Sequence, residues 1–212
     1  MNLSFLLAHP VVAILRGLVP ERALEIGWAL FDAGVRVMEV PLNSPDALSS
    51  IRVLSAQFAG SALVGAGTVL DGGQVAAVAQ AGGRLIVSPN TDALVIAESR
   101  ASGLISLPGV FTPTEAFQAL RAGADGLKLF PADSGGPGGL RALRAVLPAD
   151  VPVFAVGGVL VSNLGQWRAA GADGVGVGSA LFRPEMSAAQ VHDTALRFVR
   201  EWERLTLESA NR

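Results

Sequence analysis

Eight short apolar segments alternate with longer segments of helical periodicity along the 212 residues, and this alternation predicts an α/β fold, the (β/α)8 or TIM barrel. Two further observations favour the barrel over an open, doubly wound sheet. The open sheet usually needs only about five or six strands, and its glycine fingerprint, G-x-G-x-x-G, does not follow the first apolar segment. We therefore expect residues 1–212 to form a single barrel domain, at the small end of a fold that typically takes about 250 residues.

The predicted strands are runs of four to six residues, rich in Val, Ile, Leu and Phe and bounded by glycine, proline or polar residues. Runs of this kind indicate a buried parallel sheet. In chain order they cover residues 11–15, 35–40, 62–65, 84–87, 104–107, 125–130, 151–156 and 174–177.

The segments between the strands carry helix start and stop signals. Ser44 and Pro45 form a cap followed by a first-turn proline, Asp71 caps another helix, and Thr112 precedes Glu115 with the spacing of a capping box. Ala-Gly pairs end four helices, because glycine readily supplies the left-handed residue of the turn, at 33–34, 81–82, 122–123 and 170–171. The predicted helices cover about 20–33, 45–58, 71–81, 92–101, 112–122, 162–170 and 187–205, and a glycine-rich loop, 134–139, precedes the remaining one, the sixth in chain order.

Composition excludes several classes of function. The net charge is −2, the pI is near 5.7 and no segment is rich in Lys and Arg, so we expect no nucleic-acid partner. Mean hydropathy is positive, but glycine, proline or charge breaks each apolar run before the roughly 20 residues that a membrane span needs. Residues 1–8 lack the basic start of a signal peptide, and we expect a soluble, cytoplasmic protein without membrane contact.

Thiol and metal chemistry are not expected either. The chain has no cysteine, which excludes disulfides, thiolate metal sites and a cysteine nucleophile. His9 precedes the first predicted strand and His192 lies in the last predicted helix, and neither belongs to a cluster of possible ligands. We predict no metal site and no cofactor.

The chain contains one lysine, Lys128, and it stands inside the apolar sixth strand. Arginine stays protonated at any accessible pH, whereas a desolvated lysine can lose its proton and become a nucleophilic amine. Chance retention of one lysine in an arginine-rich sequence, or a buried ion pair, would account equally well for this residue alone.

Other polar or glycine residues gather where the predicted strands end. In a (β/α)8 barrel these carboxyl ends form the active site. The candidates are Arg16, Glu39, Thr68, Ser88 to Asn90 with Pro89 between them, Pro108 and Gly109, Lys128, Gly157 and Gly158, and Gly178 and Ser179.

Strand alternation places two of these candidates inside the barrel. Lys128 shares a face with Phe130, and Glu39 shares a face with Val37 and Val35. The two charges could form a buried salt bridge of structural value only, but such pairs add little net stability, which favours a functional role. A pKa lowered by burial would let the amine react, and Glu39 could then move protons.

Two glycine turns follow the seventh and eighth predicted strands. Gly157 and Gly158 end the seventh, and Gly178 and Ser179 end the eighth. Each alone would be an ordinary turn, but many barrels bind phosphate with backbone N–H groups at these two strands. Their combination predicts a phosphate site.

The strand-end motifs together resemble those of the KDPG/KHG aldolases, class I pyruvate aldolases built on a (β/α)8 barrel. The resemblance extends from about Val11 to Trp202 and rests on the motifs at 13–17, 39–44, 65–70, 108–109, 127–131, 156–158 and 178–179. Within the family the sequence looks more like members that act on the 6-phosphogalactonate acid than like members that act on the gluconate epimer. The gluconate members usually carry an arginine where this chain has Asn43 and a threonine where it has Val156.

The resemblance implies a reversible aldol cleavage that yields pyruvate and glyceraldehyde 3-phosphate. Lys128 would form the Schiff base, and Glu39 would move protons. Asn43 and Val156 would determine specificity, and the family tends to form homotrimers. The implied substrate-binding residues are Arg16, Thr68, Pro89, Gly157, Gly158, Gly178 and Ser179.

Alternative functions stay open on the sequence alone. The gluconate epimer could be the substrate. A barrel of this kind could also be a sugar-phosphate epimerase or isomerase in which Lys128 acts only through its charge, or a phosphosugar-binding protein without catalytic activity.

Overall fold

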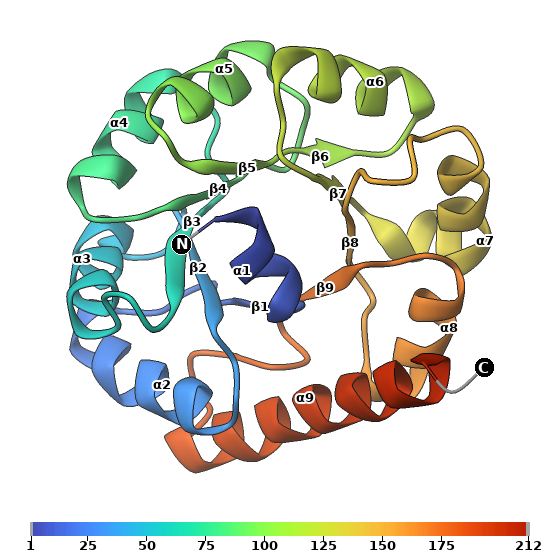
Figure 1. Cartoon of the computed structure of the whole chain (residues 1–212). Coiled ribbons are helices and arrows are strands. Elements are labelled where there is room, and N and C mark those ends of the chain that lie inside the picture. The colour runs from blue at the N-terminus through green and yellow to red at the C-terminus, as the bar shows by residue number, and fades with distance from the viewer. Residues whose placement is uncertain (1, 211–212) are drawn as a thin grey trace.

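A computed structural model describes residues 2–210 and contains a closed barrel of parallel strands surrounded by helices (Figure 1). Nine strands within these residues form one sheet in the order β5-β4-β3-β2-β1-β9-β8-β7-β6, and every paired neighbour is parallel. The strands are β1 Val11–Ile14, β2 Val37–Pro41, β3 Leu63–Gly67, β4 Leu85–Val87, β5 Ile105–Leu107, β6 Gly109–Val110, β7 Leu127–Leu129, β8 Val153–Val156 and β9 Gly174–Val177.

The predicted fifth strand, residues 104–107, corresponds to β5, and Pro108, which cannot donate a ladder hydrogen bond, separates it from an additional short strand, β6. β5 pairs with β4 and β6 pairs with β7, so the two short strands together close the barrel. Eight strand positions therefore alternate with helices, and the predicted (β/α)8 fold is confirmed. All eight predicted strands are present, with ends that differ by up to a few residues.

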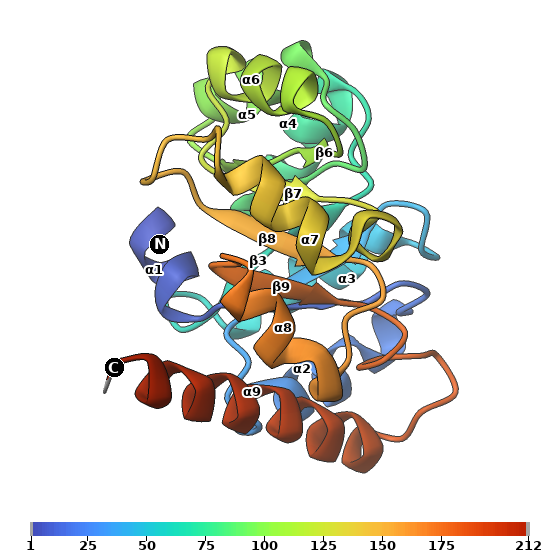
Figure 2. The same cartoon turned by 90° about the vertical axis from the view of Figure 1, so that its right-hand side faces the viewer.

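The helices outside the barrel follow the strands as the sequence predicts, and Figure 2 shows one additional helix, α1, at one end of the barrel. The helices are α1 Leu3–Ala8, α2 Pro20–Asp32, α3 Ala47–Gln57, α4 Gly72–Gln80, α5 Ala93–Ala101, α6 Pro113–Ala122, α7 Ala132–Arg144, α8 Leu164–Ala169 and α9 Ala188–Ala210, with a short 3-10 helix, η1, at Val161–Asn163. No helix within residues 2–210 is long and apolar enough to cross a membrane.

Two of the predicted caps are confirmed. Asp71 Oδ1 accepts a hydrogen bond from the backbone N–H of Gln74 at 2.9 Å. The capping box is also present, because Glu115 N–H donates to Thr112 Oγ1 at 3.3 Å and Thr112 N–H donates to Glu115 Oε2 at 2.7 Å.

Three details differ from the sequence predictions. Helix α3 starts at Ala47 and not at Pro45, because the Ser44 hydroxyl accepts a hydrogen bond from Gly17 N–H, 2.9 Å away, and does not cap a helix. The glycine-rich stretch 134–139 lies within α7, which is interrupted at Gly136 because the residue before a proline avoids helical angles. Val35 precedes β2 and packs outside the barrel with the helix layer.

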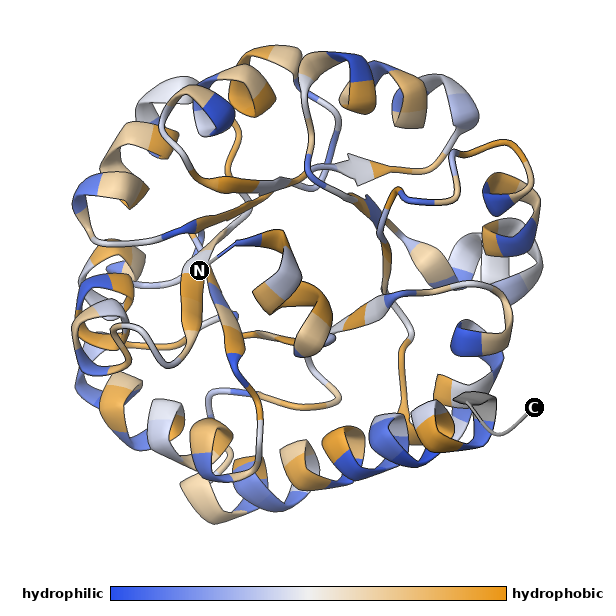
Figure 3. Cartoon of the chain, viewed as in Figure 1, coloured by the Kyte–Doolittle hydropathy of each residue, from blue (hydrophilic) through white to orange (hydrophobic). Residues whose placement is uncertain are grey.

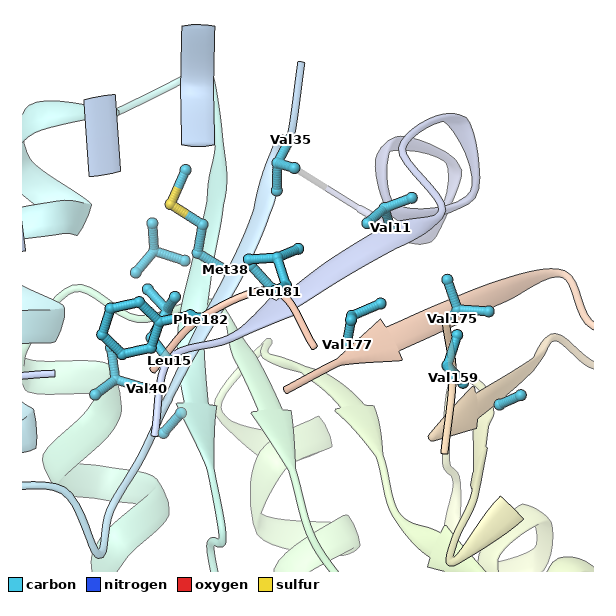
Figure 4. Packing of buried hydrophobic residues seen from close by; sticks show 14 of the residues in the cluster. Val11, Leu15, Val35, Met38, Val40, Val159, Val175, Val177, Leu181 and Phe182 are labelled. Atoms are coloured by element: carbon cyan, nitrogen blue, oxygen red, sulfur yellow. The ribbon is translucent and has the colours of Figure 1, made fainter. Parts of the chain in front are cut away.

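Two apolar layers hold the barrel together. Inside it, Leu6 of α1 packs on the buried side chains near the start of the strands, which are Val12, Val37, Leu63, Leu85 and Phe154. Between barrel and helices lies a larger layer, part of which Figure 4 shows around Leu15, Met38 and Phe182. Figure 3 shows the same arrangement as mostly hydrophobic strands and helices of mixed hydropathy. Because the cluster around Leu6 fills the barrel near the starts of the strands, the carboxyl ends of the strands are free to form a site.

Candidate functional site

A cavity of about 530 Å³ opens at the carboxyl ends of the strands. The strand-end candidates Ser88, Asn90, Pro108 and Gly109 do not line this cavity. It brings together ten of the eleven residues to which the sequence assigns a role, which are Arg16, Glu39, Thr68, Pro89, Lys128, Val156, Gly157, Gly158, Gly178 and Ser179. The remaining residue, Asn43, is not on the wall but contacts Arg16 directly. A larger hollow of about 660 Å³ lies beside α1 and α9 and contains none of the predicted residues.

Lys128 occupies the middle of β7, with its side chain inside the barrel. Its neighbours in the strand, Leu127 and Leu129, pack on the helix layer, as strand alternation predicts. Only 7% of Lys128 is exposed, and its Nζ lies 4.6 Å from the centroid of the Phe130 ring, which shares the inner face. The amine is therefore largely withdrawn from solvent, with an aromatic ring near it, on the wall of the cavity.

Burial is the main reason why the pKa of the Lys128 amine lies below its ordinary value. The Glu39 carboxylate opposes this effect and the Arg16 charge reinforces it. No ion pair joins Lys128 to Glu39 in the described part of the chain. Lys128 therefore loses its proton, and becomes a neutral nucleophile, more readily than a lysine on the protein surface.

Glu39 lies on the inner face of β2 and is only 2% exposed. Burial raises the pKa of its carboxyl from 4.5 to about 7, although the charges of Lys128 and Arg16 lower it. Among residues 2–210, no group donates a hydrogen bond to its buried Oε2. A carboxyl that titrates near neutral pH and has an unpaired oxygen can both accept and return a proton.

Gly67, at the end of β3, makes the space for this carboxyl. A β-carbon added at this position would lie 2.0 Å from Glu39 Oε2 and 2.5 Å from its carboxyl carbon. Since real β-carbons do not approach other atoms so closely, any larger residue at 67 would displace the Glu39 side chain.

Arg16 is held toward β2 by residues that follow that strand. Its Nη1 donates a hydrogen bond to Asn43 Oδ1 at 2.6 Å, and the adjacent Gly17 N–H donates to Ser44 Oγ. These contacts join the turns after β1 and β2. They also place the guanidinium where its charge acts on both Glu39 and Lys128.

Thr68 adopts a left-handed backbone conformation, with φ of +56°, directly after β3. A non-glycine residue in this region costs on the order of 1–3 kcal/mol and persists only where neighbouring structure holds it. Val69 supplies that support, because its N–H donates to Val87 O at 3.3 Å and its carbonyl accepts from Ser88 Oγ at 2.8 Å. These contacts hold Thr68 on the cavity wall in its strained backbone conformation.

The two glycine turns form the part of the cavity wall that follows β8 and β9. Gly157 and Gly158 have φ values of +112° and +65°, which favour glycine. Within residues 2–210, the backbone N–H groups of Gly158, Ser179 and Ala180 donate to no protein acceptor. Unpaired N–H groups at the lip of a cavity are suited to an anion.

Several wall residues were not predicted from the sequence. They are mostly apolar, and the exception is Arg183, which lies four residues beyond Ser179. Its position in the turn that follows β9 was the available signal. The other unpredicted wall residues are Ile14, Phe130, Val159, Leu160, Gly176, Ala180, Phe182 and Pro184.

The described residues contain no cluster of side chains that could bind a metal ion. No three His, Asp or Glu side chains among residues 2–210 come together in a way that could hold a metal ion. The polar groups available in the cavity are instead one amine, one carboxyl, two guanidinium groups, two hydroxyls and free backbone N–H groups.

Comparison with known proteins agrees with these features. The family described as "Aldolase: KDPG and KHG aldolase" matches residues 4–195. The chain is 47% identical over 193 residues to 2-dehydro-3-deoxy-6-phosphogalactonate aldolase of Escherichia coli (strain K12), covering 91% of this chain and 94% of the relative. It is 32% identical over 168 residues to KHG/KDPG aldolase of the same organism, covering 78% of each.

Comparison of the fold with solved structures also identifies an aldolase of this kind. A solved structure described as "Native KDPGal structure" superimposes with a TM-score of 0.92 at 45% identity, covering 93% of this chain and 96% of that one. The chain belongs to the KDPG and KHG aldolase family.

Proposed function

We propose that this protein is a class I aldolase that reversibly cleaves 2-dehydro-3-deoxy-6-phosphogalactonate to pyruvate and D-glyceraldehyde 3-phosphate. The observation that carries the proposal is the position of the only lysine of the chain. Lys128 is buried in the barrel, its pKa is lowered by burial, and it shares a cavity with a carboxyl that titrates near pH 7.

The first step forms the Schiff base. The neutral Lys128 amine adds to the C2 ketone of the substrate. The carbinolamine hydroxyl then takes a proton from the protonated Glu39 carboxyl and leaves as water, which gives an iminium. Arg16 assists this step indirectly, because its charge helps to keep the amine deprotonated. The burial of Lys128 disfavours a free ammonium and thus supports the neutral form.

The second step breaks the C3–C4 bond. The Glu39 carboxylate takes the proton of the C4 hydroxyl, the C3–C4 electron pair moves into the iminium, and D-glyceraldehyde 3-phosphate leaves as the aldehyde. The enamine that remains on Lys128 then takes a proton at C3 from Glu39. Water then adds to the iminium, pyruvate leaves, and Glu39 takes the released proton, which restores the neutral Lys128 amine and the protonated carboxyl, so the cycle needs no external acid or base.

The ends of the cavity suit the two ends of this substrate. Arg16, Thr68 and Pro89 lie at the strand ends nearest Glu39, and we assign them to the carboxylate and C2 end. We assign the phosphate to the opposite end, where backbone N–H groups are unpaired. The residues there are Gly157, Gly158, Gly178 and Ser179.

Two residues support the galactonate epimer over the gluconate epimer. Val156 is an apolar wall residue where gluconate members carry a hydroxyl, so it offers no hydrogen bond near C4. Asn43 is the acceptor for Arg16 where those members carry an arginine. The relative with the galactonate name is also the more similar one, at 47% identity against 32%.

A coupled assay with the two C4 epimers tests this choice. Pyruvate release is followed with lactate dehydrogenase and NADH, at matched concentrations of the galactonate and gluconate acids. We expect the larger kcat/KM for the galactonate epimer. Equal or faster cleavage of the gluconate epimer would contradict the assignment, and release of no pyruvate from either would contradict the aldolase function.

We also propose that residues 1–212 act as one domain, in a cytoplasmic homotrimer. Exposed apolar side chains support association, since Leu70, Leu94 and Phe111 are 50%, 78% and 45% exposed near the starts of the consecutive helices α4, α5 and α6. Light scattering should give three times the chain mass for the wild type and a smaller value for Leu94→Glu. Cell fractionation tests the location.

A further inference from the structure

Arg183 lies on the cavity wall after β9, and the aldol chemistry proposed above gives it no role. We propose that Arg183 is a specificity residue whose charge binds the phosphate of the substrate, so that the site selects phosphorylated aldehydes. This inference rests on the proposed function, because a phosphate is part of the proposed substrate.

The other charged side chains on the wall already have a hydrogen-bond partner or a role in the proposed chemistry. Four ionisable side chains line the cavity in the part of the chain that the structure describes, namely Arg16, Glu39, Lys128 and Arg183. Arg16 is hydrogen-bonded to Asn43, and Lys128 is the buried amine. Arg183 is therefore the cation that remains for an anion at the glycine turns.

The guanidinium of Arg183 is anchored but keeps free donors. Its Nε lies 2.7 Å from Glu185 Oε1, and its Nη1 donates to Ser179 O at 3.1 Å. Its Nη2 makes no hydrogen bond within residues 2–210. Since a guanidinium carries five N–H donors, such a partly used group can still bind a phosphate oxygen.

Ser179 links this guanidinium to the unpaired backbone donors. Its carbonyl accepts from Arg183, while its own N–H and those of Gly158 and Ala180 have no protein acceptor. These N–H groups carry no net charge, whereas a phosphate monoester carries about −1.5 to −2 at pH 7. The Arg183 cation beside these N–H groups supplies the positive charge that the turns alone lack.

The size of the effect is limited by exposure and by Glu185. The Arg183 side chain is 53% exposed, so solvent screens its charge, and the Glu185 carboxylate neutralises part of it. We therefore expect a loss of about tenfold in kcat/KM for a phosphorylated aldehyde when this charge is removed.

The test compares two aldehydes in the synthetic direction with pyruvate. In Arg183→Gln, kcat/KM for D-glyceraldehyde 3-phosphate should fall about tenfold through KM, while kcat/KM for unphosphorylated D-glyceraldehyde should change less than about twofold. Arg183→Lys should recover most of the loss. Arg204→Gln is the matched control, since Arg204 is 52% exposed and also paired with glutamate, but lies on α9.

Inorganic phosphate gives a second measurement. It should inhibit the D-glyceraldehyde reaction of the wild type at concentrations about tenfold lower than in Arg183→Gln. Equal losses for both aldehydes would show that Arg183 only supports the loop, and no loss for either would show that it does not bind phosphate; each result overturns the inference. A wild type that forms neither an aldol product nor a reducible pyruvate adduct would instead overturn the proposed function, and the inference with it.

Discussion

Replacing Glu39 with glutamine should stabilise the protein above neutral pH. Burial raises the pKa of this carboxyl from 4.5 to about 7, against the opposing charges of Lys128 and Arg16. The unfolded chain loses the proton near pH 4.5, whereas the folded chain keeps it until about pH 7. The stability that this group contributes is therefore complete below pH 4.5, falls between these values, and is lost above pH 7.

The magnitude follows from the pKa difference. A rise of about 2.5 in pKa corresponds to roughly 3 kcal/mol, because each whole pKa step is worth about 1.4 kcal/mol. Glu39 is 2% exposed, so solvent screens little of this cost. Glutamine has nearly the same shape and does not titrate. For a chain of 212 residues, roughly 3 kcal/mol corresponds to an increase in Tm of about 6–12 °C.

Urea and thermal unfolding at pH 5, 6, 7 and 8 measure this difference. Glu39→Gln should exceed the wild type by roughly 3 kcal/mol at pH 8, and the gap should shrink to about 1 kcal/mol or less at pH 5. Asp150→Asn, which removes an exposed carboxylate outside the cavity, is the control. A difference that is constant with pH, or a Glu39→Gln variant that is less stable at pH 8, would refute the reasoning.

Substitutions at three further positions test the site. Gly67→Ala should lower kcat at least about 100-fold with little change in the circular dichroism spectrum, because its β-carbon would displace the Glu39 carboxyl. Asn43→Ala should raise KM for pyruvate about fivefold to tenfold by freeing Arg16, and Asn43→Asp, which keeps an acceptor, should recover the wild-type value. Val156→Thr should raise the kcat/KM ratio of the gluconate to the galactonate epimer about tenfold, because its hydroxyl can bond near C4.

Each of these has a contrary outcome. Wild-type kcat in Gly67→Ala would mean that the carboxyl position does not control the rate. An unchanged pyruvate KM in both Asn43 variants would mean that the hydrogen bond to Arg16 has no part in binding. An unchanged epimer ratio in Val156→Thr would mean that this residue does not determine which epimer is preferred.

Local signals predicted most of the fold, and the misses have structural causes. Strand alternation placed Lys128 and Glu39 inside the barrel, because a period of two does not depend on distant contacts. Helix α1 was not predicted because its one fully buried side chain, Leu6, packs on residues far along the chain. Ser44 looked like a helix cap, but its partner, Gly17, lies 27 residues away.

The site could be predicted as a set of residues but not as an arrangement. The barrel rule brings strand ends together, which is why ten of the eleven residues with a predicted role share one cavity. The hydrogen bond from Arg16 to Asn43 and the space that Gly67 leaves for Glu39 depend on neighbouring strands, so no local pattern indicates them. Arg183 was missed because it lies beyond the strand end, in the segment that follows β9 and lines the cavity.

Reductive trapping on Lys128 is the most direct test of the proposed chemistry. The protein is incubated with pyruvate and borohydride, digested, and analysed by mass spectrometry. Because the chain has one lysine, we expect one adduct, on the peptide that contains Lys128, and neither adduct nor cleavage activity in Lys128→Met. No adduct in the wild type, or full activity in Lys128→Met, would contradict a Schiff-base aldolase.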